Sequence, residues 1–198
     1  MERLPGGFRG EILGGEIVEK TAASPRHSLA QLMLSGSVMP FVRRTGGGGP
    51  GGWWLLTEAE VEYEPHELFV HDLAGWRREA VDTPPGSRPT DPPTAPTQRP
   101  IRVRPDWVCE ILCPSNPSNW KTDTVDKLQV LLRHGVPYYW IVDLEHEVLT
   151  VYRLGNGTYE IAAQAQPGER RRLASFEALE LEVTVLLGGD AEEAGEVT

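Results

Sequence analysis

The sequence DWVCEIL, residues 106–112, predicts a strand with a carboxylate, Glu110, in the middle of its apolar side chains. Side chains alternate along a strand, so Glu110 shares a face with Asp106. A lone charge is expensive to bury, and Glu110 therefore needs a partner. A metal ion is one candidate partner, and an arginine such as Arg102 or Arg104 is the other.

Toward the C-terminus, the pattern predicts a helix over about 122–134 and then a strand, PYYWIVD (residues 137–143), buried on both faces. Such a strand belongs in the centre of a sheet. The segments VLTVYRL and TYEIAAQ predict two more strands joined as a meander, and residues 174–187 predict a last short helix or strand. We expect residues 188–198 to form a frayed acidic tail.

Toward the N-terminus, FRGEILGGEIVEK (residues 8–20) predicts a hairpin, because its Gly-Gly pair can take the positive φ angles of a tight turn. Residues 26–38 predict a helix. The glycine-rich run at 43–52 predicts a flexible loop, since glycine loses much backbone entropy when it is ordered. Two further strands are expected at about 53–63 and 67–72.

The chain length of 198 residues fits a single domain, 1–198, with a long insertion. Residues 83–100 are rich in proline, which favours extended and solvated backbone, and we expect a mobile insertion there. The strands and helices together predict an α/β domain with a central sheet of about five or six strands.

The formal net charge of −10 argues against a protein that coats nucleic acid, because such proteins normally carry a basic surface. Part of this acidity lies in the tail, and metal-binding carboxylates are acidic by necessity. No run approaches the roughly 20 apolar residues that cross a bilayer, and the N-terminus lacks a secretory pattern. We therefore expect a cytoplasmic protein without a membrane partner. Cys109 and Cys113 fall on one predicted strand and its exit, where an extended backbone holds the two side chains too far apart for an easy disulfide.

Hydrolysis of a phosphodiester with a metal ion requires carboxylates that converge on the ion and a group that orients the attacking water. Asp72, at the end of the apolar strand 67–72, and Glu110 could supply the carboxylates. The alternative for Asp72 is an ordinary turn cap. Glu16, beside the hairpin turn, is either an exposed acid or a further ligand of a shared metal site.

Lys127 has two interpretations. With Asp123 it forms the i,i+4 ion pair that is common on an exposed helix face. Because Asp123, Lys127 and Leu131 lie along one stripe of the predicted helix, Lys127 could instead point toward the sheet.

Several other residues have mainly structural interpretations. His27 is expected to belong to a helix start and not to a metal site. Trp53 and Trp54 open a strand without interleaved basic residues, which favours a core position over a base-stacking surface. Arg77 and Arg78 could either contact phosphates or lie in a solvated loop.

Five blocks of the sequence, in the same order, resemble the Uma-two family of restriction-endonuclease-like proteins, a branch of the PD-(D/E)xK nuclease superfamily. The blocks are GEILGGEIVEKTAASPRHSLAQ, GGWWLLTEAEVE, LFVHDLAGWRRE, PDWVCEILCPS and DKLQVLLRHGVPYYWIVDLE. The resemblance covers about residues 10–187. It implies a restriction-endonuclease-like fold, in which a mixed central sheet is flanked by helices and carries an N-terminal hairpin.

The resemblance also implies a metal site. Asp72 and Glu110 stand at the two acidic positions of the family and would bind Mg²⁺ or Mn²⁺, with the backbone carbonyl of Ile111 as a further ligand. Leu112 stands where the motif usually has lysine, and Lys127 on the following helix would take over that role. Its ammonium group would position and polarise the attacking water.

Asp106 and Glu16 are additional candidates for this site. The chain also departs from the family at three positions: His71 replaces the usual proline, Cys113 the usual serine, and Leu131 a frequent tyrosine.

The function implied by the resemblance is Mg²⁺-dependent endonucleolytic hydrolysis of DNA, with Asp72, Glu110 and Lys127 as catalytic residues. A homodimer would suit two cuts on a duplex. Two alternatives stay open. A catalytically inactive descendant of the fold could bind a protein partner, which suits the acidic charge. A hydrolase of small phosphoesters would need less positive surface than a nuclease.

Overall fold

A computed structural model describes residues 10–20, 23–42, 50–81, 100–112 and 122–190 of the chain. Its main strands are β1 (Gly10–Leu13), β2 (Glu16–Glu19), β3 (Trp53–Glu64), β4 (Glu67–Arg77), β5 (Trp107–Leu112), β6 (Tyr138–Asp143), β7 (Val148–Gly155) and β8 (Thr158–Ala165), with a separate pair β9 (Arg170–Arg171) and β10 (Leu181–Glu182). Its helical segments are α1 (Pro25–Val38), η1 (Met39–Val42), η2 (Thr122–Asp126), α3 (Lys127–Arg133) and α4 (Val183–Leu186).

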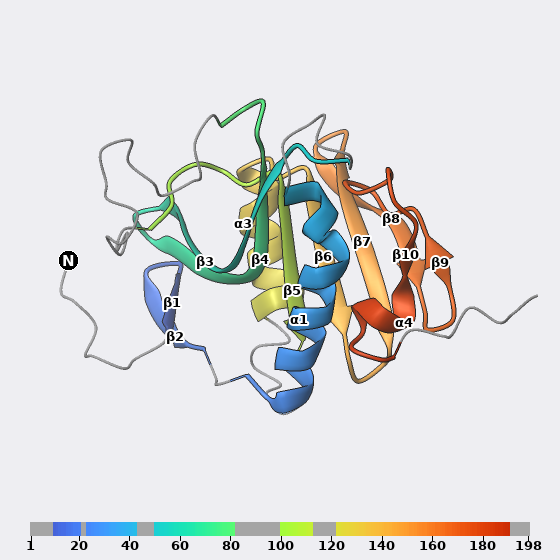
Figure 1. Cartoon of the computed structure of the whole chain (residues 1–198). Coiled ribbons are helices and arrows are strands. Elements are labelled where there is room, and N and C mark those ends of the chain that lie inside the picture. Colours follow the sequence, from blue (N-terminus) through green and yellow to red (C-terminus); the bar gives the residue numbers. More distant parts are fainter. Residues whose placement is uncertain (1–9, 21–22, 43–49, 82–99, 113–121, 191–198) are drawn as a thin grey trace, which may run out of the picture.

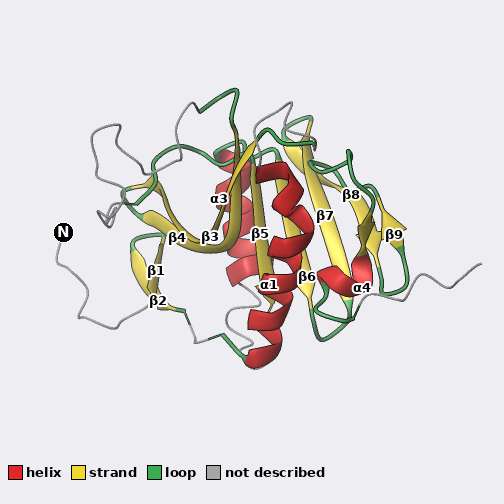
Figure 2. Ribbon diagram, in the orientation of Figure 1, coloured by secondary structure: helices red, strands yellow, loops and turns green. Residues whose placement is uncertain are grey.

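The centre of the molecule is an eight-stranded sheet with the order β2-β1-β4-β5-β6-β7-β8, in which β3 also pairs with β4 (Figure 1). β5 and β6 run parallel, and their other neighbours run antiparallel. Helices α1 and α3 lie on opposite faces of this sheet (Figure 2). The expected α/β fold with a mixed sheet and an N-terminal hairpin is confirmed. The sheet is larger than expected because the hairpin joins it through β1.

The local predictions at the N-terminus are confirmed. Gly14 and Gly15 have φ angles of 59° and 86°, as the tight turn between β1 and β2 requires. Helix α1 starts at Pro25, and the Ser24 hydroxyl accepts a hydrogen bond from the backbone N–H of His27 at 3.2 Å. Such a cap satisfies an amide that has no partner inside the helix.

Strand β4 extends beyond the predicted end at Asp72 and reaches Arg77. The prediction was wrong because the segment after Asp72 also pairs with β3 on one side and β5 on the other. Gly75 makes this pairing compatible with a crowded core. A Cβ atom there would come within 2.7 Å of Leu55 and 3.2 Å of both Trp53 and Trp107.

The sheet contains a fork along β4, and this fork is the feature that positions the site. Near its start, β4 pairs with β1 at Ile12↔Leu68. From Leu73 onward it pairs instead with β5, beginning with Leu73↔Cys109. Asp72 lies between these two pairings. Backbone groups in such a gap must find side-chain or water partners, because a buried amide without a partner is costly.

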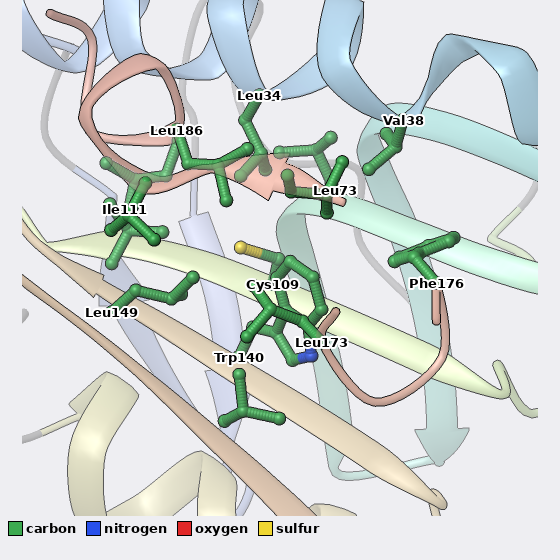
Figure 3. Packing of buried hydrophobic residues seen from close by; sticks show 14 of the residues in the cluster. Leu34, Val38, Leu73, Cys109, Ile111, Trp140, Leu149, Leu173, Phe176 and Leu186 are labelled. Carbon is green, nitrogen blue, oxygen red and sulfur yellow. The ribbon is translucent and has the colours of Figure 1, made fainter. Parts of the chain in front are cut away.

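The face of the sheet under α1 is apolar. Figure 3 shows Leu34 and Val38 of α1 packed toward Leu73 and Cys109, with Phe176 closing one end of the same cluster. Full burial of a valine, leucine or phenylalanine side chain stabilises the folded state by roughly 1.5–3 kcal/mol. Cys109 is a free buried thiol, and Cys113 lies outside the described residues.

The remaining sequence predictions divide into two groups. The helix expected over 122–134 is present as η2 and α3, and the strand expected at 137–143 is β6, buried over its central positions. Three of the predicted segments lie mostly outside the described residues. They are the glycine-rich loop up to residue 49, the proline-rich insertion up to residue 99 and the acidic tail from residue 191. Among the described helices, none is long and apolar enough to span a membrane.

Candidate active site

Charged side chains from five parts of the chain meet at the fork in the sheet. We call this group the acid–lysine cluster; its members are Glu11, Lys20, His27, His71, Asp72, Glu110, Asp123 and Lys127. Asp72, Glu110 and Lys127, the three residues expected to carry the chemistry, are 2%, 1% and 0% exposed. The Asp72 backbone N–H lies 3.4 Å from Glu110 Oε2, and Lys127 Nζ lies 3.0 Å from Glu110 Oε1. The structure therefore brings all three together.

The Asp72 carboxylate has a positively charged and hydrogen-bonding environment. Lys20 Nζ lies 2.9 Å from Asp72 Oδ1, and His27 Nε2 lies 3.1 Å from Oδ2. The backbone N–H of Ile111 also donates to Oδ2, at 2.7 Å. Burial alone would raise the pKa of Asp72, but Lys20 and the hydrogen bonds from His27 and Ile111 lower it below its ordinary value. Asp72 is therefore a stable carboxylate.

Side chains replace the missing sheet pairing in the fork. The Val70 N–H donates to Glu11 Oε1 at 2.9 Å, and Gln31 Nε2 donates to the Asp72 carbonyl at 2.9 Å. Opposite Asp72 on β3, the register passes from Thr57 to Ala59, and Glu58 between them has a φ of 50°. Residues other than glycine rarely adopt this left-handed backbone conformation, so the surrounding structure must hold Glu58 in it.

Lys127 lies on the other side of the cluster and contacts three carboxylates. Its Nζ is 2.8 Å from Glu11 Oε1, 2.8 Å from Asp123 Oδ1 and 3.0 Å from Glu110 Oε1. An ammonium group has three N–H donors, and these contacts can use all of them. Burial lowers the pKa of Lys127, but Asp123, Glu11 and Glu110 raise it well above its ordinary value, so the group stays protonated. The interpretation in which Lys127 points toward the sheet is confirmed. The ion pair with Asp123 forms, but it is buried and not on an exposed helix face.

His71 fixes the orientation of Glu110. Its Nδ1 lies 2.6 Å from Glu110 Oε1, and its Nε2 lies 2.9 Å from the Tyr63 hydroxyl. Burial, followed by the nearby Lys127, lowers the pKa of His71 well below its ordinary value, so the ring is neutral. When Glu110 is ionised, Nδ1 carries the proton and Nε2 accepts from Tyr63.

The cluster has more carboxylates than cationic groups. Four acids face the two lysines, and the pKa values of two acids reflect this excess. Burial raises the pKa of Glu110 to about 7, with Lys127 opposing and Asp72 reinforcing the shift. Burial likewise raises the pKa of Asp123 to about 7, against the lowering effect of Lys127. An added positive charge would relieve both shifts.

This donor set fits a magnesium-type ion. Mg²⁺ is usually bound through one or two carboxylates and keeps several waters, and Asp72 and Glu110 offer such a pair. Among the described residues, no three His, Cys, Asp or Glu side chains are arranged to hold one metal ion, so that part of the chain contains no zinc-type cage. The N–H and C=O of one strand residue face the same side, so the Ile111 carbonyl shares the edge on which Ile111 N–H meets Asp72.

Two additional candidates from the sequence lie apart from these contacts. Asp106 accepts a hydrogen bond from the Arg77 backbone N–H at 2.8 Å and lies 3.8 Å from Arg104. Glu16 is exposed and pairs with Leu13 at the end of the hairpin. Among the described residues, neither side chain makes a hydrogen bond or an ion pair with Asp72 or Glu110.

The arginine alternative for Glu110 is wrong, because Arg102 and Arg104 pair with Glu62 and Asp106 instead. The expected core position of Trp53 is confirmed, with 3% exposure, whereas Trp54 is half-buried. The guanidinium of Arg78 lies 3.3 Å from the centre of the Trp54 ring and also donates to the Trp53 carbonyl at 3.0 Å. Arg78 therefore has a structural role.

Sequence reasoning did not assign Glu11, Lys20 or Asp123 to the site, and it gave His27 only a helix-start role. One signal was available for His27. It lies on the same helical stripe as Ala30 and Leu34, and that stripe is the buried face of α1. A histidine on a buried helical stripe needs a polar partner, which here is Asp72.

The part of the sequence that forms this site matches the model of a known protein family. The family model described as "Uma2: Putative restriction endonuclease" matches residues 1–185, a range that contains every member of the acid–lysine cluster. Among solved structures, the chain is similar to the crystal structure of a "putative nuclease belonging to DUF820" from Anabaena variabilis, with a TM-score of 0.64, 19% identity and 93% coverage of both chains. At that identity the likeness shows the fold alone. A search of curated proteins found no match.

Proposed function

The chain belongs to the Uma2 family of restriction-endonuclease-like proteins, and we propose that it is a Mg²⁺- or Mn²⁺-dependent endonuclease that hydrolyses DNA phosphodiester bonds at the acid–lysine cluster. One observation carries this proposal. Asp72 and Glu110, from neighbouring strands, meet where the pairing of β4 and β5 ends, and the 3.4 Å contact between Asp72 N and Glu110 Oε2 joins them.

The charge of the cluster supports a role in binding a divalent cation. The buried carboxylates exceed the ammonium groups, and the pKa of Glu110 is raised to about 7 by burial and by Asp72, against the opposing effect of Lys127. When bound, a divalent ion supplies positive charge for the phosphate oxygens and lowers the pKa of water.

The residues around the carboxylates have separate roles in this proposal. Lys127 keeps its protons at Nζ and presents a fixed positive charge beside Glu110 Oε1. Because its three N–H groups face carboxylates, it would act on an attacking water through its charge alone, and it would not act as the base. His71 Nδ1 contacts the same Glu110 oxygen at 2.6 Å, which limits rotation of the carboxylate.

Plasmid nicking with Mg²⁺ or Mn²⁺ tests the proposal. We expect Asp72→Asn, Glu110→Gln and Lys127→Met to reduce the rate by at least about 100-fold, because each removes a charge from the reacting centre. Asp106→Asn is the matched control, since this acid precedes the same strand as Glu110 and pairs elsewhere. Activity of the three variants equal to that of the control would refute the site.

A second candidate function follows from the net charge of −10, which favours a substrate smaller than DNA. The same variants should be assayed with a chromogenic phosphodiester. Turnover of the small substrate without nicking of plasmid DNA would replace the nuclease proposal with a small-phosphoester hydrolase. A protein that binds no Mn²⁺ and cleaves neither substrate would instead support the inactive, partner-binding alternative.

A further inference from the structure

The two lysines of the cluster have different surroundings. Lys127 is 1% exposed by side chain and contacts three carboxylates. Lys20 is 16% exposed by side chain and contacts one carboxylate, Asp72, together with the Val70 carbonyl at 2.5 Å. Lys20 also follows the last residue of β2, Glu19, so its backbone lies outside the strand. Lys127 is thus fixed inside the cluster, and Lys20 is the more exposed of the two lysines.

Three contacts surround the Asp72 carboxylate, and the one on Oδ1 comes from an ammonium group. Oδ2 accepts from His27 and from the Ile111 amide, and Oδ1 contacts Lys20 Nζ at 2.9 Å. A divalent ion that binds through Oδ1 therefore meets an ammonium group at hydrogen-bond distance from the same oxygen. Two cations at such a separation repel each other strongly, because the site is shielded from water.

We propose that Lys20 is an internal competitor for the divalent cation: it occupies Asp72 Oδ1 in the metal-free protein and leaves this oxygen when the ion binds. The chain thereby lowers its own metal affinity. This inference rests on the metal site of the proposed function, but it concerns Lys20 alone.

The side chain of Lys20 is suited to such a movement. A lysine has a long flexible stem and a compact, strongly hydrated ammonium group, and here that group starts from a partly exposed position. The surrounding acids also keep the group charged. Lys20 Nζ lies 2.9 Å from Asp72 Oδ1, and such an ion pair favours the charged form of the amine. A charged Lys20 competes with a cation, whereas a neutral amine would not.

Calorimetric titration of the full chain with Mn²⁺, without DNA, tests the inference. Lys20→Met keeps most of the stem and removes the charge, and we expect it to bind Mn²⁺ at least about tenfold more tightly than the wild type. Arg26→Gln is the matched control, because this cation is 53% exposed and pairs with Glu147 outside the cluster. We expect the control to change the affinity less than twofold. Equal or weaker Mn²⁺ binding by folded Lys20→Met would overturn the inference.

Two further measurements separate the possible failures. Asp72→Asn should abolish Mn²⁺ binding; if neither the wild type nor any variant binds Mn²⁺, the proposed metal site fails together with this inference. If Lys20→Met does not fold, amine labelling of the wild type followed by peptide mass spectrometry gives the answer, since the chain has only three lysines. Mg²⁺ should increase labelling of Lys20 and leave that of Lys127 low. Labelling of Lys20 that is independent of Mg²⁺ would overturn the inference.

Discussion

The acid–lysine cluster has two halves, one around Asp72 and one around Glu110, and the pKa values of these two carboxylates are shifted in opposite directions. In the Asp72 half, one acid is surrounded by Lys20, His27 and a backbone N–H, and its pKa is lowered despite burial. In the Glu110 half, burial raises the pKa of Glu110 to about 7 although Lys127 lies 3.0 Å away. Proximity to a lysine does not by itself decide the ionisation of a buried acid. Burial outweighs Lys127 at Glu110, and Asp72 adds to the rise, whereas at Asp72 the charge of Lys20 and the hydrogen bonds from His27 and Ile111 outweigh burial.

The largest effect is expected from removing the shared lysine. Lys127→Met would leave Glu11, Glu110 and Asp123 buried without their common cation, and we expect the free energy of unfolding to fall by about 3–5 kcal/mol. Urea unfolding at pH 7.5 measures this loss. Lys20→Met should lose much less. Equal losses in both variants would show that the two halves are equivalent.

The halves should also differ in how stability depends on pH. The pKa of Glu110 rises from 4.5 to about 7 in the folded protein, chiefly through burial, so the folded state binds its proton more tightly than the unfolded state. Its contribution is fully present below about pH 4.5 and is lost as the pH rises to about 7, by about 3 kcal/mol. Asp72, whose pKa is lowered, loses its contribution only as the pH falls below 4. Urea midpoints from pH 4 to 8, for the wild type and Glu110→Gln, test this; a wild-type slope retained in the variant would contradict it.

Amide substitutions compare the halves directly at pH 7.5. Asp72→Asn removes a charge that is well compensated and should cost about 1–2 kcal/mol of stability. Glu110→Gln relieves repulsion with Asp72 and should change stability by less than about 0.5 kcal/mol, or increase it. Thermal unfolding ranks the two variants. A larger loss in Glu110→Gln would reverse our assignment of the halves.

The most local effect is expected at the edge of the Glu110 half. Tyr63→Phe removes the hydroxyl that lies 2.9 Å from His71 Nε2, and we expect a loss of about 1 kcal/mol. The proton on His71 Nδ1 should stay in place, because Glu110 still accepts it. Nitrogen-15 NMR of the histidine ring reports the tautomer directly. A shift of the proton to Nε2 would mean that Tyr63, and not Glu110, sets the state of the ring.

The strands and helices were largely predictable from the sequence because their signals are local. Gly14-Gly15, Ser24-Pro25 and the apolar run of β6 each determine a short piece of structure through nearby residues. The end of β4 was missed because it depends on pairing with β3 and β5, which no local pattern encodes. The two strands that flank the chemistry were therefore found, but not their junction.

The site was predictable only in part for the same reason. Asp72, Glu110 and Lys127 were candidates from the sequence pattern, the family resemblance singled them out, and the structure brings them together. Glu11 and Lys20 reach the cluster from a hairpin more than fifty positions before Asp72, so no spacing rule could reveal them. The position of Asp123 stayed open between an exposed ion pair and a stripe facing the sheet, because an i,i+4 pair looks the same in sequence whether or not it is buried.

The fork in the sheet also gives the protein a built-in spectroscopic probe. The Ile111 amide donates to a side-chain oxygen of Asp72, where a regular sheet would provide a backbone carbonyl. Its proton therefore senses the charge and coordination of that oxygen while the strand itself stays still. A single backbone resonance should report, without any label near the ligand, when the carboxylate gains or loses a cation.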